Sequence, residues 1–168
     1  MTYLSPASTT EPTGGTHTTR EVTTTALAVS SAPGVAYETL LRLVFPAEPS
    51  DILDITARAR VTNMTEFPLV AVGYGLWIFD AELPPEDRIW TQIGPQREGS
   101  TDPVRTVLAM HTEDVYQVPA EWPEGHRMAV VYRGDAYAPD LDPEAPPVAL
   151  DVDAAYGSVT IRRWLALP

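Results

Sequence analysis

Apolar and polar residues alternate along much of this chain, and a period of two predicts β-strands with one buried face. The clearest example is residues 52–63, where Ile55, Ala57 and Val61 share one side. The residues on the opposite side are all polar: Thr56, Arg58, Arg60 and Thr62. This segment is therefore expected to be a strand with its apolar side in a core and its polar side in water.

The same pattern predicts about eight strands in all. They span residues 23–31, 35–45, 52–63, 69–80, 104–118, 126–137, 148–152 and 157–167. In the second of these, Val35, Tyr37, Leu41 and Phe45 are expected on one face because they stand an even number of residues apart. The polar residues 112–114 are expected to break the fifth strand in two.

Residues 69–80, LVAVGYGLWIFD, are apolar on both faces and contain Gly73 and Gly75. This is typical of a central strand, or of a strand whose outer face meets another chain. The next 23 residues, 81–103, hold Pro-Pro, Gly-Pro and Asp-Pro pairs. Proline interrupts regular structure, so we expect a long irregular connection, of the kind that often carries function or faces a partner.

The fold class follows from these elements. No segment has helical periodicity, so no crossover helices are available to build a parallel sheet, and we expect antiparallel strands. Eight strands with long connections predict an all-β sandwich of the jelly-roll or Greek-key type, with two sheets packed face to face. An immunoglobulin-like sandwich is the alternative, although its Cys…Trp…Cys marker is absent.

Residues 1–22 differ from the rest, because they are rich in Thr, Ser, Pro and Gly and contain few apolar side chains. Such a segment cannot offset its ordering entropy alone, so we expect an extended N-terminal arm that becomes ordered on binding. Residues 23–168 are expected to form a single β-sandwich domain. The arm residues that we expect to contact a partner are Tyr3, Leu4, Thr10, Thr19 and Arg20.

The composition excludes several classes of function. The chain has 168 residues, 44% of them hydrophobic, with no cysteine and a formal net charge of -12. Clustered cations are needed to bind phosphates, so a nucleic-acid partner is not expected. The longest apolar run is too short to cross a membrane, and no secretory signal stands at the N-terminus, so we expect synthesis in a cytoplasm and no membrane partner.

No catalytic motif is present: the chain lacks a G-x-S-x-G elbow, an H-E-x-x-H pair and a P-loop. His111 near Glu113 and Asp114 fits a solvated strand edge better than an acid–base pair. The acidic residues between 135 and 153 lack EF-hand spacing, which favours a solvated loop over a calcium site. Loop carboxylates are candidate glycosidase pairs on residue type alone, either among Glu82, Glu86 and Asp87 or between Glu121 and Glu124. We expect no enzyme activity, no cofactor and no bound metal.

Three tryptophans are candidate partner contacts. Trp90 and Trp122 lie in proline-rich connections, where a tryptophan stacks on sugars, anchors a protein interface or fills a minor core. Trp164 shares a strand face with Arg162, which fits packing between subunits or an ordinary sheet edge. Trp77 lies in an apolar strand and is expected in the core.

In overall layout the chain resembles the jelly-roll decoration (cement) proteins of tailed-phage capsids, especially those of actinobacterial hosts. The features that carry the resemblance are the polar arm, the strands ILDITARARVTN and LVAVGYGLWIFD, and the closing strand GSVTIRRWLAL. The resemblance implies a homotrimer on the exterior of the virion, whose arm crosses neighbouring major capsid protein subunits. The alternative function is a carbohydrate- or receptor-binding β-sandwich of a phage tail or cell surface.

Overall fold

The structure is a computed structural model that describes residues 14–144 and 146–165. Within these residues the chain forms ten strands and one 3-10 turn. The strands are β1 (Thr16–Thr19), β2 (Ala26–Ser30), β3 (Glu38–Pro46), β4 (Ile52–Thr62), β5 (Val70–Asp80), β6 (Thr91–Thr101), β7 (Val107–Gln117), β8 (Arg127–Tyr137), β9 (Val148–Val152) and β10 (Ser158–Trp164), with the turn η1 at Pro85–Asp87.

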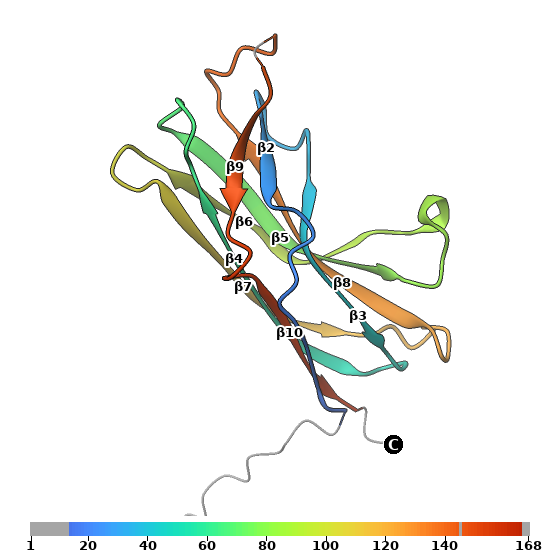
Figure 1. Ribbon diagram of the computed structural model, residues 1–168. Helices are drawn as coiled ribbons and strands as arrows, with labels where there is room; N and C mark the ends of the chain where they lie inside the picture. Colours follow the sequence, from blue (N-terminus) through green and yellow to red (C-terminus); the bar gives the residue numbers. More distant parts are fainter. Residues whose placement is uncertain (1–13, 145, 166–168) are drawn as a thin grey trace, which may run out of the picture.

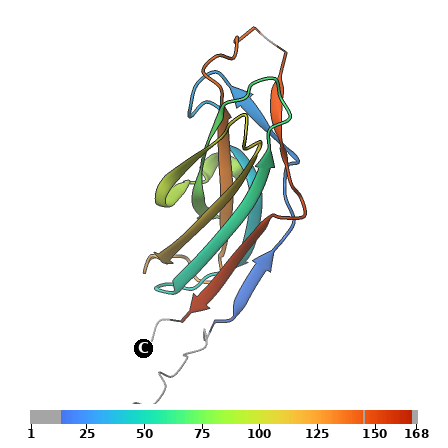
Figure 2. The ribbon, with the colours of Figure 1, turned by 90° about the vertical axis from the view of Figure 1, so that its left-hand side faces the viewer.

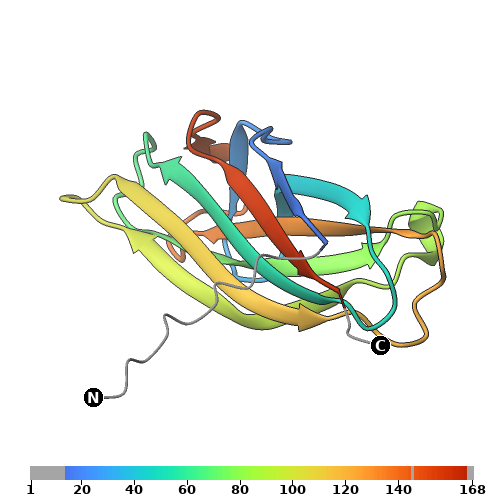
Figure 3. The same ribbon diagram turned by 90° about the horizontal axis from the view of Figure 1, so that it is seen from below.

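The strands form two layers, as Figures 1 and 3 show. One layer has the order β7-β4-β10-β1, and Figure 2 faces its outer side. The other has the order β6-β5-β8-β3. Strands β2 and β9 pair with each other and join the two layers, because β2 also pairs with β8 and β9 with β4. The fold is an all-β sandwich of the jelly-roll type, as the sequence predicted.

One core lies between the layers. Strand β4 supplies Leu53, Ile55, Ala57, Ala59 and Val61 to it, all fully buried. The alternation of this strand is therefore confirmed residue by residue. At roughly 25 cal/mol for each Å² of apolar surface removed from water, this shared core is the main source of stability.

Strand β5 is buried on both faces, as its sequence predicted. Its inner side joins the main core, and its outer side carries Trp77 and Phe79 into a second cluster with Ala129 and Val131 of β8. Tyr37, Val44 and Ala81 pack against this cluster. The outer cluster is covered by the chain itself.

The structure corrects the interpretation of residues 81–103. They are not an irregular connection throughout, because residues 91–101 form β6 and pair with β5. The register shifts between Tyr74 and Leu76, where Gly94 has a φ of 63° and Pro95 follows. A bulge at this edge accommodates the Gly-Pro pair without ending the strand.

Three further expectations were wrong. Strand β7 runs unbroken through residues 112–114, because Thr112 points into the core and Glu113 into solvent. A bulge between Thr39 and Leu41 changes the alternation of β3, so Tyr37 lies on the face opposite to Leu41. The antiparallel prediction holds for the other pairs, but β2 and β8 are parallel at Val29 and Ser30.

Candidate functional site

The base of the predicted arm is part of the sandwich. Strand β1 pairs with β10 from Thr16, opposite Arg162, to Thr19, opposite Val159. Before the strand, Gly14 donates its N–H to the carbonyl of Arg163 at 3.0 Å, and Arg163 donates back to Gly15 at 3.0 Å. Both ends of the described chain therefore lie at the same end of the molecule (Figure 1). Residues 14–19 belong to the folded body.

A buried ion pair supports this base. Arg163 points inward from β10 and donates its Nε–H to Oδ2 of Asp51, whose side chain is 2% exposed. The same oxygen accepts the N–H of Glu48 at 3.0 Å. A Cβ at position 14 would stand 2.5 Å from Cγ of Arg163, so the chain passes close to the arginine only because residue 14 is glycine. These contacts fix where the chain leaves the body.

His17 joins the two layers at their β1 and β3 edges. Its ring centre lies 5.4 Å from that of Phe45, which is 1% exposed. Its Nε2 is buried without a hydrogen-bond partner. Val22 then forms an isolated bridge with Leu41 of β3. The segment thus crosses from one layer to the other.

The predicted arm contacts fall into two groups. Tyr3, Leu4 and Thr10 lie outside the described residues. Thr19 is half-buried at the end of β1, and Arg20 is exposed just after it. Their role as partner contacts remains a prediction.

Trp90 lies at the end of the β5–β6 connection and is 41% exposed. Its ring centre is 4.5 Å from that of Phe79, and the guanidinium carbon of Arg133 lies 4.7 Å from it. Arg133 also lies 5.5 Å from the rings of Tyr37 and Trp77, and it donates to the Tyr37 carbonyl at 2.8 Å. Burial lowers the pKa of Arg133. This arginine ties the connection to the outer cluster.

Trp122 and Trp164 have different surroundings. Trp122 is half-buried against the main core and donates its Nε1–H to the His126 carbonyl at 3.3 Å. Nδ1 of His126 in turn lies 2.6 Å from Oδ2 of Asp80. Trp164 is half-buried at the end of β10, opposite Ile52. The structure does not bring the three tryptophans Trp90, Trp122 and Trp164 together in one described cluster.

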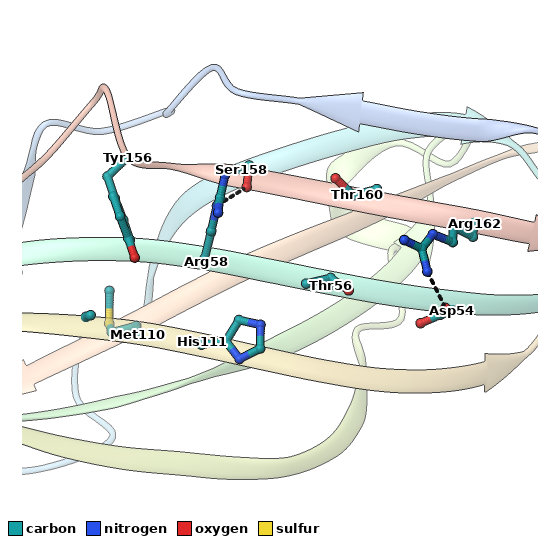
Figure 4. Close-up of a pocket in the computed structure, with 10 residues that line it drawn as sticks. Asp54, Thr56, Arg58, Met110, His111, Tyr156, Ser158, Thr160 and Arg162 are labelled. Carbon is teal, nitrogen blue, oxygen red and sulfur yellow. Dashed lines mark hydrogen bonds and ion pairs between the residues drawn. The ribbon is translucent and has the colours of Figure 1, made fainter.

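Sequence reasoning missed a hollow on the outer face of β7, β4 and β10 (Figure 4). It has a volume of about 390 Å³. Most of its lining residues come from the outer sides of these strands and from the turn before β10, and the fully buried Met110 is also among them: Asp54, Thr56, Arg58, Ala109, Met110, His111, Tyr156, Ser158, Thr160 and Arg162. The strand pattern predicted that Thr56, Arg58, Thr160 and Arg162 lie opposite the apolar faces of their strands, but the pairing of strands that gathers them is not visible in the sequence.

The described residues contain no group of three or more His, Cys, Asp or Glu side chains arranged to hold a metal ion. His111 is exposed on the outer face of β7, whereas Asp114 points to the other face and lies against Gly94. Because the two side chains lie on opposite faces of β7, they do not form an acid–base pair. No helix in the described part of the chain is long and apolar enough to cross a membrane.

No protein-family model and no curated protein matches this chain. The solved structures that this chain resembles include those of infectious bursal disease virus and of particles derived from it. The chain aligns with the infectious bursal disease virus Gx strain structure with a TM-score of 0.54 and 8% identity, covering 89% of this chain and 33% of that chain. The crystal structure of the VP2 subviral particle of that virus aligns with a TM-score of 0.53 and 9% identity, covering 89% of this chain and 32% of that chain.

A third similar structure is that of T=1 particles derived from the same virus, with a TM-score of 0.53 and 10% identity over 89% of this chain and 31% of that chain. The chain therefore spans about a third of the length of each of these proteins. At this identity the likeness concerns the fold.

Proposed function

We propose that this protein is a structural component of a virion. In this role it binds the outer surface of a tailed-phage capsid as a homotrimer, and its N-terminal arm contacts the major capsid protein. The role needs neither an active site nor a cofactor.

The observation that carries the proposal is the anchored base of the arm on a sandwich of the viral capsid type. Residues 16–19 pair with β10, and Gly14 lies against the side chain of Arg163, which forms the buried pair with Asp51. Thirteen residues precede this point in the sequence, with Met1, Tyr3 and Leu4 as their large apolar side chains. A segment tethered at a fixed point reaches a neighbouring surface at high effective concentration, so weak contacts add up to firm binding.

Charge supports an outward position. The net charge of -12 favours solubility and opposes contact with the packaged genome, because like charges repel. Trimer formation increases the affinity for the capsid further, because three linked arms bind more tightly together than one arm does alone. The ordering of the arm costs free energy that is recovered only on the capsid.

The test uses capsids of the phage that encodes the chain, prepared without this protein. The full chain and a chain starting at residue 14 are each mixed with the capsids and sedimented, and their mass is measured by light scattering after size exclusion. We expect the full chain to sediment and to have trimer mass, and the shortened chain to stay in the supernatant. Absence of full-length protein from the pellet would refute the capsid role, and a monomer mass would refute the trimer.

A carbohydrate- or receptor-binding module is the second candidate, and the exposure of Trp90 favours it. The Trp90 ring already lies against Phe79, however, and Trp122 packs against the core. A glycan array with Trp90→Ala and Trp122→Ala variants separates the two functions. Glycan binding that both substitutions abolish would support this candidate over the capsid role.

A further inference from the structure

The hollow on the outer face of β7, β4 and β10 is built from rows of side chains that cross three strands. One row is Ser158, Arg58 and His111, which are directly paired across β10, β4 and β7. The next row along the strands contains Thr160 and Thr56. Small-molecule sites occupy roughly 300–1,000 Å³, and the volume of about 390 Å³ falls in that range.

Arg58 differs from its neighbouring arginines. Arg60 pairs with Asp153, and Arg162 lies 3.7 Å from Asp54. Within the described residues Arg58 has no carboxylate partner, and its Nε–H is held by Oγ of Ser158 at 2.9 Å. This bond fixes the guanidinium over the hollow and leaves its two terminal nitrogens as donors. Figure 4 shows Arg58 beside Tyr156, with His111 across the hollow.

Tyr156 forms one wall and is 36% exposed. The guanidinium carbons of Arg58 and Arg60 lie 5.7 and 4.8 Å from its ring centre. The turn that carries the ring is held in place, since Tyr156 donates its N–H to the Asp153 carbonyl at 3.1 Å. The hydrogen bond from Arg60 lowers the pKa of Asp153 and keeps this partner ionised. The aromatic wall is therefore pre-positioned.

The remaining lining is rich in hydroxyl groups, from Thr56, Ser158 and Thr160. Hydroxyls both donate and accept hydrogen bonds, so they match the hydroxyls of a sugar. The backbone N–H and C=O groups of β4 are engaged in ladders with β7 and β10, which leaves no main-chain groups for an added peptide strand. Recognition here must come from side chains, which favours a small ligand over a peptide.

We propose that this hollow binds a carboxylated sugar unit. The carboxylate accepts two N–H groups of Arg58, the sugar ring lies against Tyr156, and the sugar hydroxyls bind Thr56 and Thr160. Two carboxylates are part of this surface: Asp54 lines the hollow and lies 3.7 Å from Arg162, and Glu113 is paired with Thr56 across β4 and β7. A single unpaired arginine beside them suits one carboxylate of the ligand better than a more highly charged phosphate.

The test uses the full chain without any capsid, so its outcome does not depend on the capsid role. A disaccharide that ends in glucuronic acid is titrated into ¹⁵N-labelled protein, with cellobiose, acetate and inorganic phosphate as separate probes at equal ionic strength. We expect saturable shifts of amide signals of β4, β7 and β10 with the glucuronic acid disaccharide, and much weaker ones with the other probes.

Variants assign the shifts to the hollow. Loss of a charged hydrogen bond costs a factor of about ten or more in affinity, which is the expected effect of Arg58→Gln. Tyr156→Ala is expected to weaken binding and Tyr156→Phe to retain it. The matched control is Arg105→Gln, an exposed arginine of the β6–β7 connection. No saturable shift, equal response to cellobiose or acetate, or unchanged affinity in Arg58→Gln would each overturn the proposal.

Discussion

The guanidinium carbon of Arg133 lies 4.7 Å from the ring centre of Trp90, which joins the middle of β8 to the end of the β5–β6 connection. The sequence left two explanations for the two-sided apolar strand β5: a central position or contact with another chain. The structure favours the first, because β5 lies between β6 and β8. Its outer side chains are covered within the chain, since Trp90 lies against Phe79 and Tyr37 against Trp77. An interface with another chain is not needed to bury Trp77 or Phe79.

Arg133→Met should release the β5–β6 connection. The variant loses the contact with Trp90 and the hydrogen bond to the Tyr37 carbonyl, so we expect a loss of about 1–3 kcal/mol in the free energy of unfolding. Proteolysis within residues 81–90 should become faster, as measured by mass spectrometry of the fragments. Arg105→Met is the matched control, and equal proteolysis of the two variants would contradict the role given to Arg133.

The Arg163–Asp51 pair should be a strong stability determinant. Arg163→Met leaves the Asp51 carboxylate buried without its cation, and breaking a buried pair in this way costs about 3–5 kcal/mol. Urea denaturation measures the change. The double variant Asp51→Asn with Arg163→Met should be more stable than Arg163→Met alone, because no unpaired charge remains. A double variant that is less stable would show that the Asp51 carboxylate stabilises the fold even without its cation, through the hydrogen bond that it accepts from the N–H of Glu48.

Alkaline pH should destabilise the protein through Tyr132. Burial raises the pKa of this fully buried tyrosine well above its ordinary value of 10.0, while Thr112 lies 3.3 Å from its hydroxyl. Above pH 10 the unfolded chain loses this proton and the folded chain keeps it, so stability falls as pH rises, by about 1.4 kcal/mol per pH unit for one such group. Stability below pH 10 is unaffected by this group.

The check is the free energy of unfolding between pH 8 and 11.5. Tyr132→Phe should flatten the decline. Tyr116, whose pKa burial also raises, is half-buried, and Tyr116→Phe should flatten it less. Equal slopes for the wild type and Tyr132→Phe would contradict the assignment.

Some strands could be predicted from the sequence and others could not. The alternation in β4 and the two-sided pattern of β5 reflect burial directly, so both strands were predicted. Strand β6 was missed because Gly94 and Pro95 normally end a strand, and only a bulge against β5 allows them inside one. The candidate site was harder still, since Ser158, Arg58 and His111 become neighbours through strand pairing alone.

The bulge gives its own prediction. Gly94 and Gly125 both have positive φ, 63° and 78°, but a Cβ at position 94 would meet the Asp114 carboxylate whereas one at 125 would meet nothing within 4 Å. Gly125→Ala should therefore cost about 1–2 kcal/mol from backbone strain alone. Gly94→Ala should cost about 1–3 kcal/mol more, as overpacking does. Equal losses in thermal or urea unfolding would mean that Asp114 moves aside freely.

The boundary between arm and body lies nearer to residue 14 than the composition predicted, and truncation tests it. A chain starting at residue 14 keeps the Gly14–Arg163 hydrogen bond and the whole of β1. A chain starting at residue 20 loses both and uncovers Phe45, against which His17 packs. We expect the first to be as stable as the full chain and the second to be less stable by at least about 2 kcal/mol.

Urea unfolding of the three chains measures this difference. His17→Phe in the full chain is the control, because it keeps the ring against Phe45 and removes the buried Nε2 that has no partner, and it should not destabilise the protein. Equal stability of the chains starting at 14 and 20 would mean that β1 adds nothing to the body. In that case loss of capsid binding on removing residues 1–19 would be attributable to the arm as a whole. With the expected result, only removal of residues 1–13 tests the arm without damaging the sandwich.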